Sequence, residues 1–140
     1  MSDFDNKSYI VVVQCHIVME RCSGFFCERA FNGRTGGFEA LPKDSQTRIA
    51  YLTCGGCCGR ALQRKLVNLV EKAGKKDGIA KESILVKLAS CVTRDNHHGP
   101  PCPHLDYLKT LISRLGLDVS MDTHLSAKAT RLRSEGVYKS

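Results

Sequence analysis

The chain has 140 residues, a length that fits one domain, and 42% of them are hydrophobic, enough for a core without cross-links. The formal charge of +7 invites a nucleic-acid interpretation, but no recognition motif or interleaved aromatic residues support it. The eight cysteines would also lose protons on binding metal, which would cancel much of this charge. We therefore do not expect nucleic acid as a partner.

The start of the chain resembles neither a secretory signal nor a membrane anchor. Residues 1–7 are mostly polar and acidic. The longest apolar run, residues 10–13, is far shorter than the roughly 20 residues that a membrane-spanning helix needs. We therefore expect a cytoplasmic protein without a membrane partner. In that compartment thiols stay reduced, so many cysteines indicate metal binding or catalysis rather than a disulfide scaffold.

Strand and helix patterns alternate along the chain. They predict, in order, a strand over 9–15, a helix over 23–31, a glycine-rich loop over 33–47, a strand over 49–53, a helix over 59–73, a charged connector over 75–82, a strand over 84–91, a helix over 103–115 and an edge strand over 118–123. Gly74 is predicted to end the second helix. Pro103 suits a first helical position, which predicts Cys102 as the N-cap of the third helix.

This alternation favours the α/β class. We expect a three-layer αβα domain with an open, mainly parallel four-stranded sheet and flavodoxin-like topology. Residues 1–125 are assigned to this domain and residues 126–140 to a polar, basic C-terminal tail. In folds of this class, ligands bind outside the carboxyl ends of the strands.

Metal-binding side chains follow all four predicted strands. Cys15 closes the first strand, Cys54 follows the second, Cys91 closes the third and His124 follows the fourth. Because the carboxyl ends of parallel strands lie at one edge of a sheet, soft ligands are predicted to converge there. A metal or redox site at this edge is therefore the leading functional hypothesis.

The strongest local signal is the C-x-x-C unit of Cys54 and Cys57. Its two glycines allow a sharp turn that aims both sulfurs at one ion. The chain has no second C-x-x-C unit, so further ligands must come from separate loops, with Cys91 and Cys102 the first candidates. The remaining candidate ligands are Cys15, Cys22, Cys27, His104 and His124.

Plainer interpretations of these residues stay open. Cysteine packs well as a small hydrophobe, which could explain Cys15 at the end of a buried strand. Cys22 and Cys27 could form a pair of their own or join the central group. The imidazole of His104 or His124 could instead make an ordinary hydrogen bond, or it could hydrogen-bond to a metal ligand and orient it.

An ordered series of motifs resembles the CGGC-domain family over about residues 8–124. The motifs are Cys15, Cys22-Ser-Gly-Phe-Phe-Cys27, Thr53-Cys-Gly-Gly-Cys57, Ser90-Cys91, Cys102-Pro-His104 and Thr123-His124. The resemblance implies a metal-binding domain in which cysteines and histidines hold zinc. It also implies a proline after the central motif, where this chain has Cys58, so Cys58 is not counted among the shared ligands.

The residues leave the kind of centre and its chemistry open. Thiolate ligation suits both zinc and an iron–sulfur cluster, and zinc is preferred because the family resemblance implies it and the spacing fits no standard ferredoxin run. Alternatively, Cys54 and Cys57 could exchange disulfides with a redox partner protein. Cys54-x5-Arg60 also matches the phosphate loop of small tyrosine phosphatases and arsenate reductases, although Ala61 stands where that loop has Ser or Thr.

Overall fold

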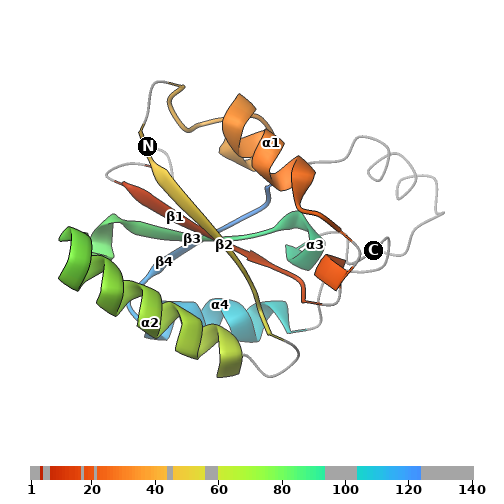
Figure 1. Cartoon of the computed structure of the whole chain (residues 1–140). Coiled ribbons are helices and arrows are strands. Elements are labelled where there is room, and N and C mark those ends of the chain that lie inside the picture. The colour runs from red at the N-terminus through yellow and green to blue at the C-terminus, as the bar shows by residue number, and fades with distance from the viewer. Residues whose placement is uncertain are drawn as a thin grey trace.

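The computed structural model describes residues 4, 7–16, 18–20, 22–43, 46–55, 60–93 and 104–123. Within these residues a four-stranded sheet lies between helices (Figure 1). The elements are β1 (Tyr9–Gln14), η1 (Val18–Glu20), α1 (Phe25–Gly33), η2 (Gly36–Phe38), β2 (Arg48–Thr53), α2 (Arg60–Asp77), η3 (Lys81–Ser83), β3 (Ile84–Leu88), α3 (Ser90–Thr93), α4 (Leu105–Arg114) and β4 (Asp118–Met121).

The sheet has the strand order β2-β1-β3-β4, and all of its paired strands are parallel. Gln14 pairs with Thr53, and Leu88 pairs with both Val13 and Met121. The chain moves outward from β1 to β2 and then returns across β1 to β3, so the order reverses between β1 and β3. The predicted α/β class with flavodoxin-like topology is confirmed.

Helices cover the sheet on both sides, which gives three layers (Figure 1). We call the side with α1 and η2 the α1 face and the side with α2 and α4 the α2/α4 face. Val11 and Val13 of β1 join the buried cluster of the α2/α4 face, whereas Ile10 and Val12 join that of the α1 face. A strand buried on both faces needs apolar residues at every position, which explains the continuous β-branched run.

The predicted end of the second helix is wrong. Helix α2 continues through Gly74 to Asp77. It ends at Gly78, whose φ of 65° lies in the left-handed region that favours glycine. The amides of Gly78 and Ile79 donate to the carbonyls of Gly74 and Ala73, so the helix end is closed by backbone hydrogen bonds.

Two further boundaries near predicted ligands are also wrong. Strand β3 ends at Leu88 rather than at Cys91, because the chain turns after Ala89 into the short helix α3. The Val92 amide donates to the Ala89 carbonyl in this turn. Helix α4 begins at Leu105 with His104 as its N-cap, so Cys102 is not the N-cap.

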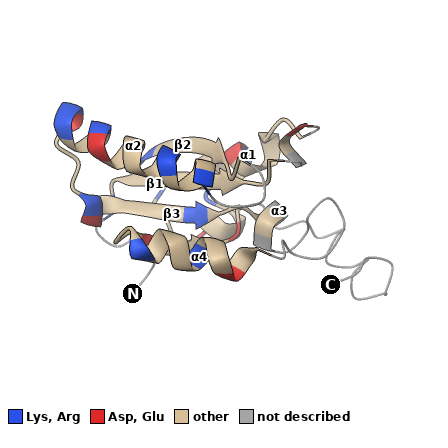
Figure 2. Ribbon diagram, turned by 90° about the horizontal axis from the view of Figure 1, so that it is seen from below, with Lys and Arg blue, Asp and Glu red and all other residues tan. Residues whose placement is uncertain are grey.

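Charged residues are distributed over several elements. Lys and Arg lie on α2, β3 and α4, with acidic residues among them on α2 and α4 (Figure 2). This mixture differs from the single basic face that is typical of nucleic-acid-binding domains. Among the described residues, no helix combines the length and apolar character needed to cross a bilayer.

Candidate metal centre

Two predicted ligands meet on the α2/α4 face at the carboxyl edge of the sheet. Cys15 and Cys54 directly follow Gln14 and Thr53, which pair across β1 and β2. The Cys54 amide donates to the Gln14 carbonyl over 3.0 Å, which extends the ladder by one bond. Both side chains belong to one buried cluster, with exposed fractions of 6% for Cys15 and 7% for Cys54. The structure therefore places these two cysteines beyond neighbouring strand ends, in one buried cluster at the predicted edge.

Cys27 lies at the same edge but on the opposite face of the sheet. It occupies the first turn of α1 and packs against the apolar cluster of the α1 face. Its Sγ is 3.2 Å from Oγ1 of Thr123, a residue that follows β4. The sheet thus separates the Cys27 thiol from the thiols of Cys15 and Cys54.

The other two described candidates are exposed. Cys22 precedes α1, and its Sγ accepts a hydrogen bond from the Gly24 amide over 3.4 Å. His104 caps α4, whose amino end lies at the carboxyl edge because the helix returns toward the start of β4. Neither side chain belongs to the two buried clusters.

The rest of the predicted ligand set cannot be located. Cys57, Cys102 and His124 lie outside the described residues, and of Cys91 only the backbone is described. Within the part of the chain that the structure describes, no three Cys, His, Asp or Glu side chains gather closely enough to hold an ion. The described thiols are soft donors of the kind that zinc and iron–sulfur centres use, and they supply part of such a set.

His16 is a candidate that the sequence interpretation missed. Its Nδ1 lies 3.2 Å from Oγ1 of Thr53, directly before Cys54. Lys65 of α2 donates from Nζ to the carbonyl oxygen and to Oγ1 of the same threonine, over 3.1 and 3.3 Å. An ammonium group at this place would stabilise negative charge on nearby thiolates. In the sequence, the feature that could have identified His16 is its position directly after the candidate ligand Cys15.

Ser90 and Thr123 were also missed, and they bind each other. The Thr123 amide donates to Oγ of Ser90 over 3.0 Å, and the Ser90 amide donates to Oγ1 of Thr123 over 3.3 Å. The signal was their place in the Ser90-Cys91 and Thr123-His124 motifs, each directly before a predicted ligand. These bonds hold the chain after β3 against the chain after β4.

Tyr51 lies on the α1 face, as Cys27 does. Its hydroxyl is buried and has no hydrogen-bond partner among the described residues. Burial is the main cause that raises the pKa of Tyr51 to about 12, and charges on Cys27 and Glu28 add to it. The phenol is therefore neutral at physiological pH.

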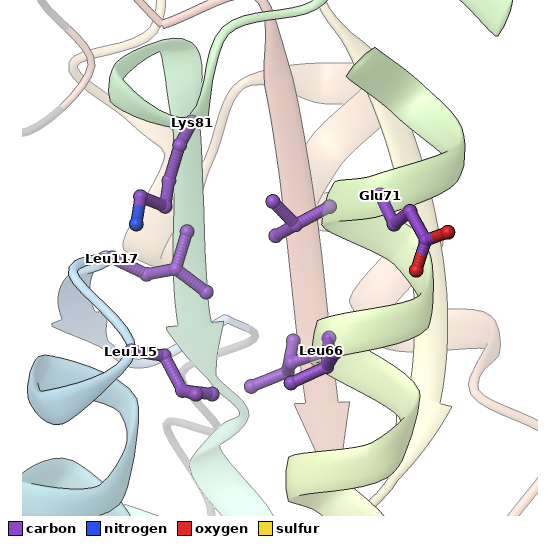
Figure 3. Close-up of a pocket in the computed structure, with 7 residues that line it drawn as sticks. Leu66, Glu71, Lys81, Leu115 and Leu117 are labelled. Atoms are coloured by element: carbon purple, nitrogen blue, oxygen red, sulfur yellow. The ribbon is translucent and has the colours of Figure 1, made fainter. Parts of the chain in front are cut away.

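A pocket of about 320 Å³ lies elsewhere, between α2 and the turn from α4 to β4 (Figure 3). Its lining consists of Leu66, Val67, Val70, Glu71, Lys81, Leu115 and Leu117. Lys81 and Leu117 precede β3 and β4, so the pocket lies toward the amino ends of these strands, away from the thiols. It contains neither a thiol nor an imidazole and is separate from the candidate metal centre.

The fold and these thiols define a three-layer α/β domain with cysteines at the carboxyl edge of a parallel sheet. The family model for the CGGC domain matches residues 9–124. The chain therefore belongs to the CGGC-domain family, to which metal binding is attributed. The resemblance inferred from the ordered motifs is confirmed.

Two curated relatives come from Methanocaldococcus jannaschii. The uncharacterized protein MJ0582 is 27% identical over 127 residues, which cover 85% of this chain and 88% of the relative. The uncharacterized protein MJ0766 is 29% identical over 76 residues, which cover 54% of this chain and 98% of the relative. No solved structure matches the chain significantly.

Proposed function

We propose that the chain holds a zinc ion through thiolates at the carboxyl edge of its parallel sheet. The observation that carries this proposal is the burial of Cys15 and Cys54 beyond the paired ends of β1 and β2. The proposed ligands are Cys54, Cys57, Cys91 and Cys102, with Cys15, Cys22, Cys27, His104 and His124 as further candidates. Bound zinc would tie loops from different strands together and stabilise the fold.

Electrostatics supports ligation more than packing at this place. A thiolate in an apolar cluster is costly unless a cation neutralises it, so buried cysteines are either neutral or bound to metal. Packing alone would explain two neutral thiols. It does not explain why Lys65 and His16 contact Thr53, directly before Cys54. The Lys65 ammonium group, held at Thr53, would favour ionised, metal-binding thiols at this edge.

The same donors suit an iron–sulfur cluster, which is the alternative centre. We prefer zinc because the partly described set mixes thiols with His16 and His104, and mixed sulfur and nitrogen ligation is common for structural zinc. We also propose a cytoplasmic location, because thiols stay reduced in that compartment and remain able to bind metal.

The two enzyme alternatives receive less support. A nucleophilic cysteine must be reached by its substrate, but Cys54 is only 7% exposed. The Cys54-x5-Arg60 loop also follows β2, an edge strand, rather than the point between β1 and β3 where the strand order reverses. These observations disfavour both thiol–disulfide exchange with a redox partner and phosphate-loop chemistry.

Elemental analysis with an absorption spectrum tests the proposal on the full chain, purified without oxygen and without chelators. We expect stoichiometric zinc and no visible colour. Brown absorption with iron and sulfide would replace zinc by an iron–sulfur cluster. A chain that takes up neither metal after incubation with zinc or with iron and sulfide would overturn the metal-binding proposal.

Replacing Cys54 by Val tests the role of that sulfur. We expect Cys54→Val to weaken zinc binding at least about 10-fold, while the free energy of unfolding of the metal-free chain changes by less than about 1.5 kcal/mol. Leu88→Ile is the matched control, because Leu88 lies in the same buried cluster and neither leucine nor isoleucine has a donor atom for zinc. Unchanged zinc affinity in Cys54→Val would remove Cys54 from the ligand set.

A further inference from the structure

The pocket between α2 and the turn from α4 to β4 is large enough for a small molecule. Its volume of about 320 Å³ lies near the lower limit of roughly 300 Å³ for ligand pockets. Lys81 and Leu117 lie along one side of it, and Leu66 of α2 lies opposite them (Figure 3). Because a water molecule occupies about 30 Å³, the pocket has room for about ten groups of that size.

Most of the described pocket lining is apolar, from its most buried residues to its mouth. Leu66 and Leu117 are buried, with exposed fractions of 0% and 4%. Val70 and Leu115 are partly buried, and Val67 is 47% exposed. Aliphatic side chains give water few hydrogen-bond partners, so an aliphatic group would replace water here favourably.

Two charged residues complete the described lining, and only one of them has a partner for its charge. Oε1 of Glu71 accepts a hydrogen bond from Nζ of Lys75 over 2.9 Å. The Glu71 carboxylate also points away from Lys81 (Figure 3). The Lys81 ammonium group has neither a hydrogen bond nor an ion pair with the residues that the structure describes. The charge available to a ligand is therefore positive.

Gly116, in the turn after α4, determines where the Lys81 ammonium group lies. Its φ is 79°, and a Cβ there would be 3.0 Å from Nζ and 3.3 Å from Cε of Lys81. The missing side chain lets the ammonium group lie against the turn that carries Leu115 and Leu117. The carboxyl end of a helix has partial negative charge, which also favours a cation at this place. Lys81 is thus positioned beside an apolar pocket.

We propose that this pocket binds a small amphipathic anion, with its aliphatic part between α2 and the turn after α4 and its anionic group at Lys81. Charge complementarity selects the class of ligand, because the walls suit an aliphatic body and the ammonium group suits an anion. A medium-chain carboxylate such as octanoate, with about ten non-hydrogen atoms, matches the volume. The pocket lies toward the amino ends of β3 and β4, so this proposal does not depend on metal binding at the carboxyl edge.

Calorimetric titration of the full chain with straight-chain carboxylates tests the proposal. Octanoate should bind with a Kd of about 1 mM or below. From butanoate to octanoate, each added methylene should tighten binding about 4-fold, as expected for its burial. The gain should stop near ten carbons, when the pocket is full. No saturable binding of octanoate up to about 10 mM would overturn the proposal, and so would a gain that continues to dodecanoate, as on an open surface.

Methyl resonances locate the bound octanoate. We expect shifts at Val67, Val70, Leu115 and Leu117, which line the pocket from both sides. The methyl groups of Ile10, which is buried on the α1 face, should stay in place. Shifts confined to residues outside the pocket would overturn the assignment of the site.

Lys81→Met tests the anionic group, since it removes the charge and keeps most of the stem. Octanoate should bind about 5-fold more weakly, the upper range for an exposed ion pair, whereas uncharged octanol should bind as it does to wild type. Glu71→Gln is the matched control at the same pocket, and it should leave octanoate binding unchanged or slightly tighter. Equal octanoate affinity in Lys81→Met and wild type would contradict an anionic ligand.

Val70→Phe tests the pocket itself, because the larger ring would fill it. Octanoate binding should fall at least about 10-fold. Leu69→Phe is the control, since Leu69 is the neighbouring, partly buried residue of α2 and does not line the pocket. If Val70→Phe does not fold, the methyl shifts and Lys81→Met decide. A wild-type dimer that Val67→Lys converts to monomer, without octanoate binding, would assign the pocket to a second copy of the chain and overturn the proposal.

Discussion

The two faces of the sheet give their cysteines different surroundings. On the α2/α4 face, Cys15 and Cys54 lie in a cluster of buried aliphatic residues from two strands, β1 and β3, and three helices, α2, α3 and α4. On the α1 face, the cluster is smaller, and Cys27 at its border contacts the hydroxyl of Thr123. In the first environment the polar contacts of His16 and Lys65 reach Thr53, directly before Cys54, whereas in the second a hydroxyl contacts the sulfur itself.

A buried ammonium group strengthens this contrast. Lys87 of β3 points to the α1 face and is only 2% exposed. Its Nζ donates to Oγ of Ser120 over 2.9 Å and to the Met121 carbonyl over 3.1 Å. The same nitrogen lies 5.6 Å from the centre of the Phe38 ring, within cation–π range. The α1 face is thus held to β4 by polar contacts in addition to apolar packing.

On the α1 face, the largest loss of stability is expected when a methyl group is added at Gly37. A Cβ there would lie 2.0 Å from the carbonyl oxygen of Asp122, which is backbone and cannot rotate away. Gly37→Ala should therefore force η2 away from β4 and weaken the bond from the Gly37 amide to Thr123. We expect the free energy of unfolding in urea to fall by up to about 3 kcal/mol.

Gly74 in α2 is the matched position on the other face. A Cβ there would be 3.7 Å from its nearest neighbour, the Ile79 carbonyl oxygen, which is ordinary contact. Because glycine inside a helix is less favourable than alanine, Gly74→Ala should stabilise the chain by about 0.5–1 kcal/mol. If Gly37→Ala and Gly74→Ala changed the free energy of unfolding equally, the two faces would not differ in how tightly their backbones are packed.

A second test removes the buried charge and keeps the volume. Lys87→Met leaves Oγ of Ser120 and the Met121 carbonyl without their donor, so we expect a loss of about 1.5 kcal/mol in the free energy of unfolding. Lys65→Met is the counterpart on the α2/α4 face. Lys65 is exposed, and its replacement should change stability by less than about 0.5 kcal/mol. A Lys87→Met chain as stable as wild type would show that the ammonium group is not needed to hold β4.

The smallest effect is expected for Tyr51→Phe. The lost hydroxyl is buried and has no partner among the described residues, so stability near neutral pH should stay the same or rise by up to about 1 kcal/mol. The pKa of Tyr51 is raised from 10.0 to about 12. Since the folded state then favours the neutral phenol, wild-type stability should fall as pH rises from 10 to 12.

The variant lacks this titration, and its advantage over wild type should grow across the same pH range. Chemical denaturation of both proteins at several pH values measures the difference. A marked loss of stability in Tyr51→Phe at neutral pH would mean that the hydroxyl has a partner after all.

The class of fold could be predicted because its signals are local. The run at residues 10–13 is apolar at every position, which only a strand covered on both faces tolerates, and the helices between strands have clear apolar stripes. Once the strands are parallel, their carboxyl ends share one edge. The positions of Cys15 and Cys54 at that edge follow directly from this geometry.

The details of the site depend on contacts between distant parts of the chain and could not be predicted. Gly74 and Gly78 are equally good helix ends by residue type, and only the backbone bonds after Asp77 choose between them. The end of β3 depends on Ser90 meeting Thr123, 33 positions later. The face on which Cys27 lies follows from the path of α1 across the sheet, which no spacing of cysteines specifies.

The long separation between Cys27 and Thr123 has a consequence for folding kinetics. These residues are 96 positions apart, so their contact closes a very large loop and belongs to the slowest kind of native contact to form. During synthesis the amino-terminal strands emerge first, while the partner of Cys27 is still being translated. Until β4 docks, the thiol of Cys27 has no Thr123 hydroxyl beside it. The contact between α1 and the end of β4 therefore forms only after the chain has been synthesised through residue 123 and β4 has docked.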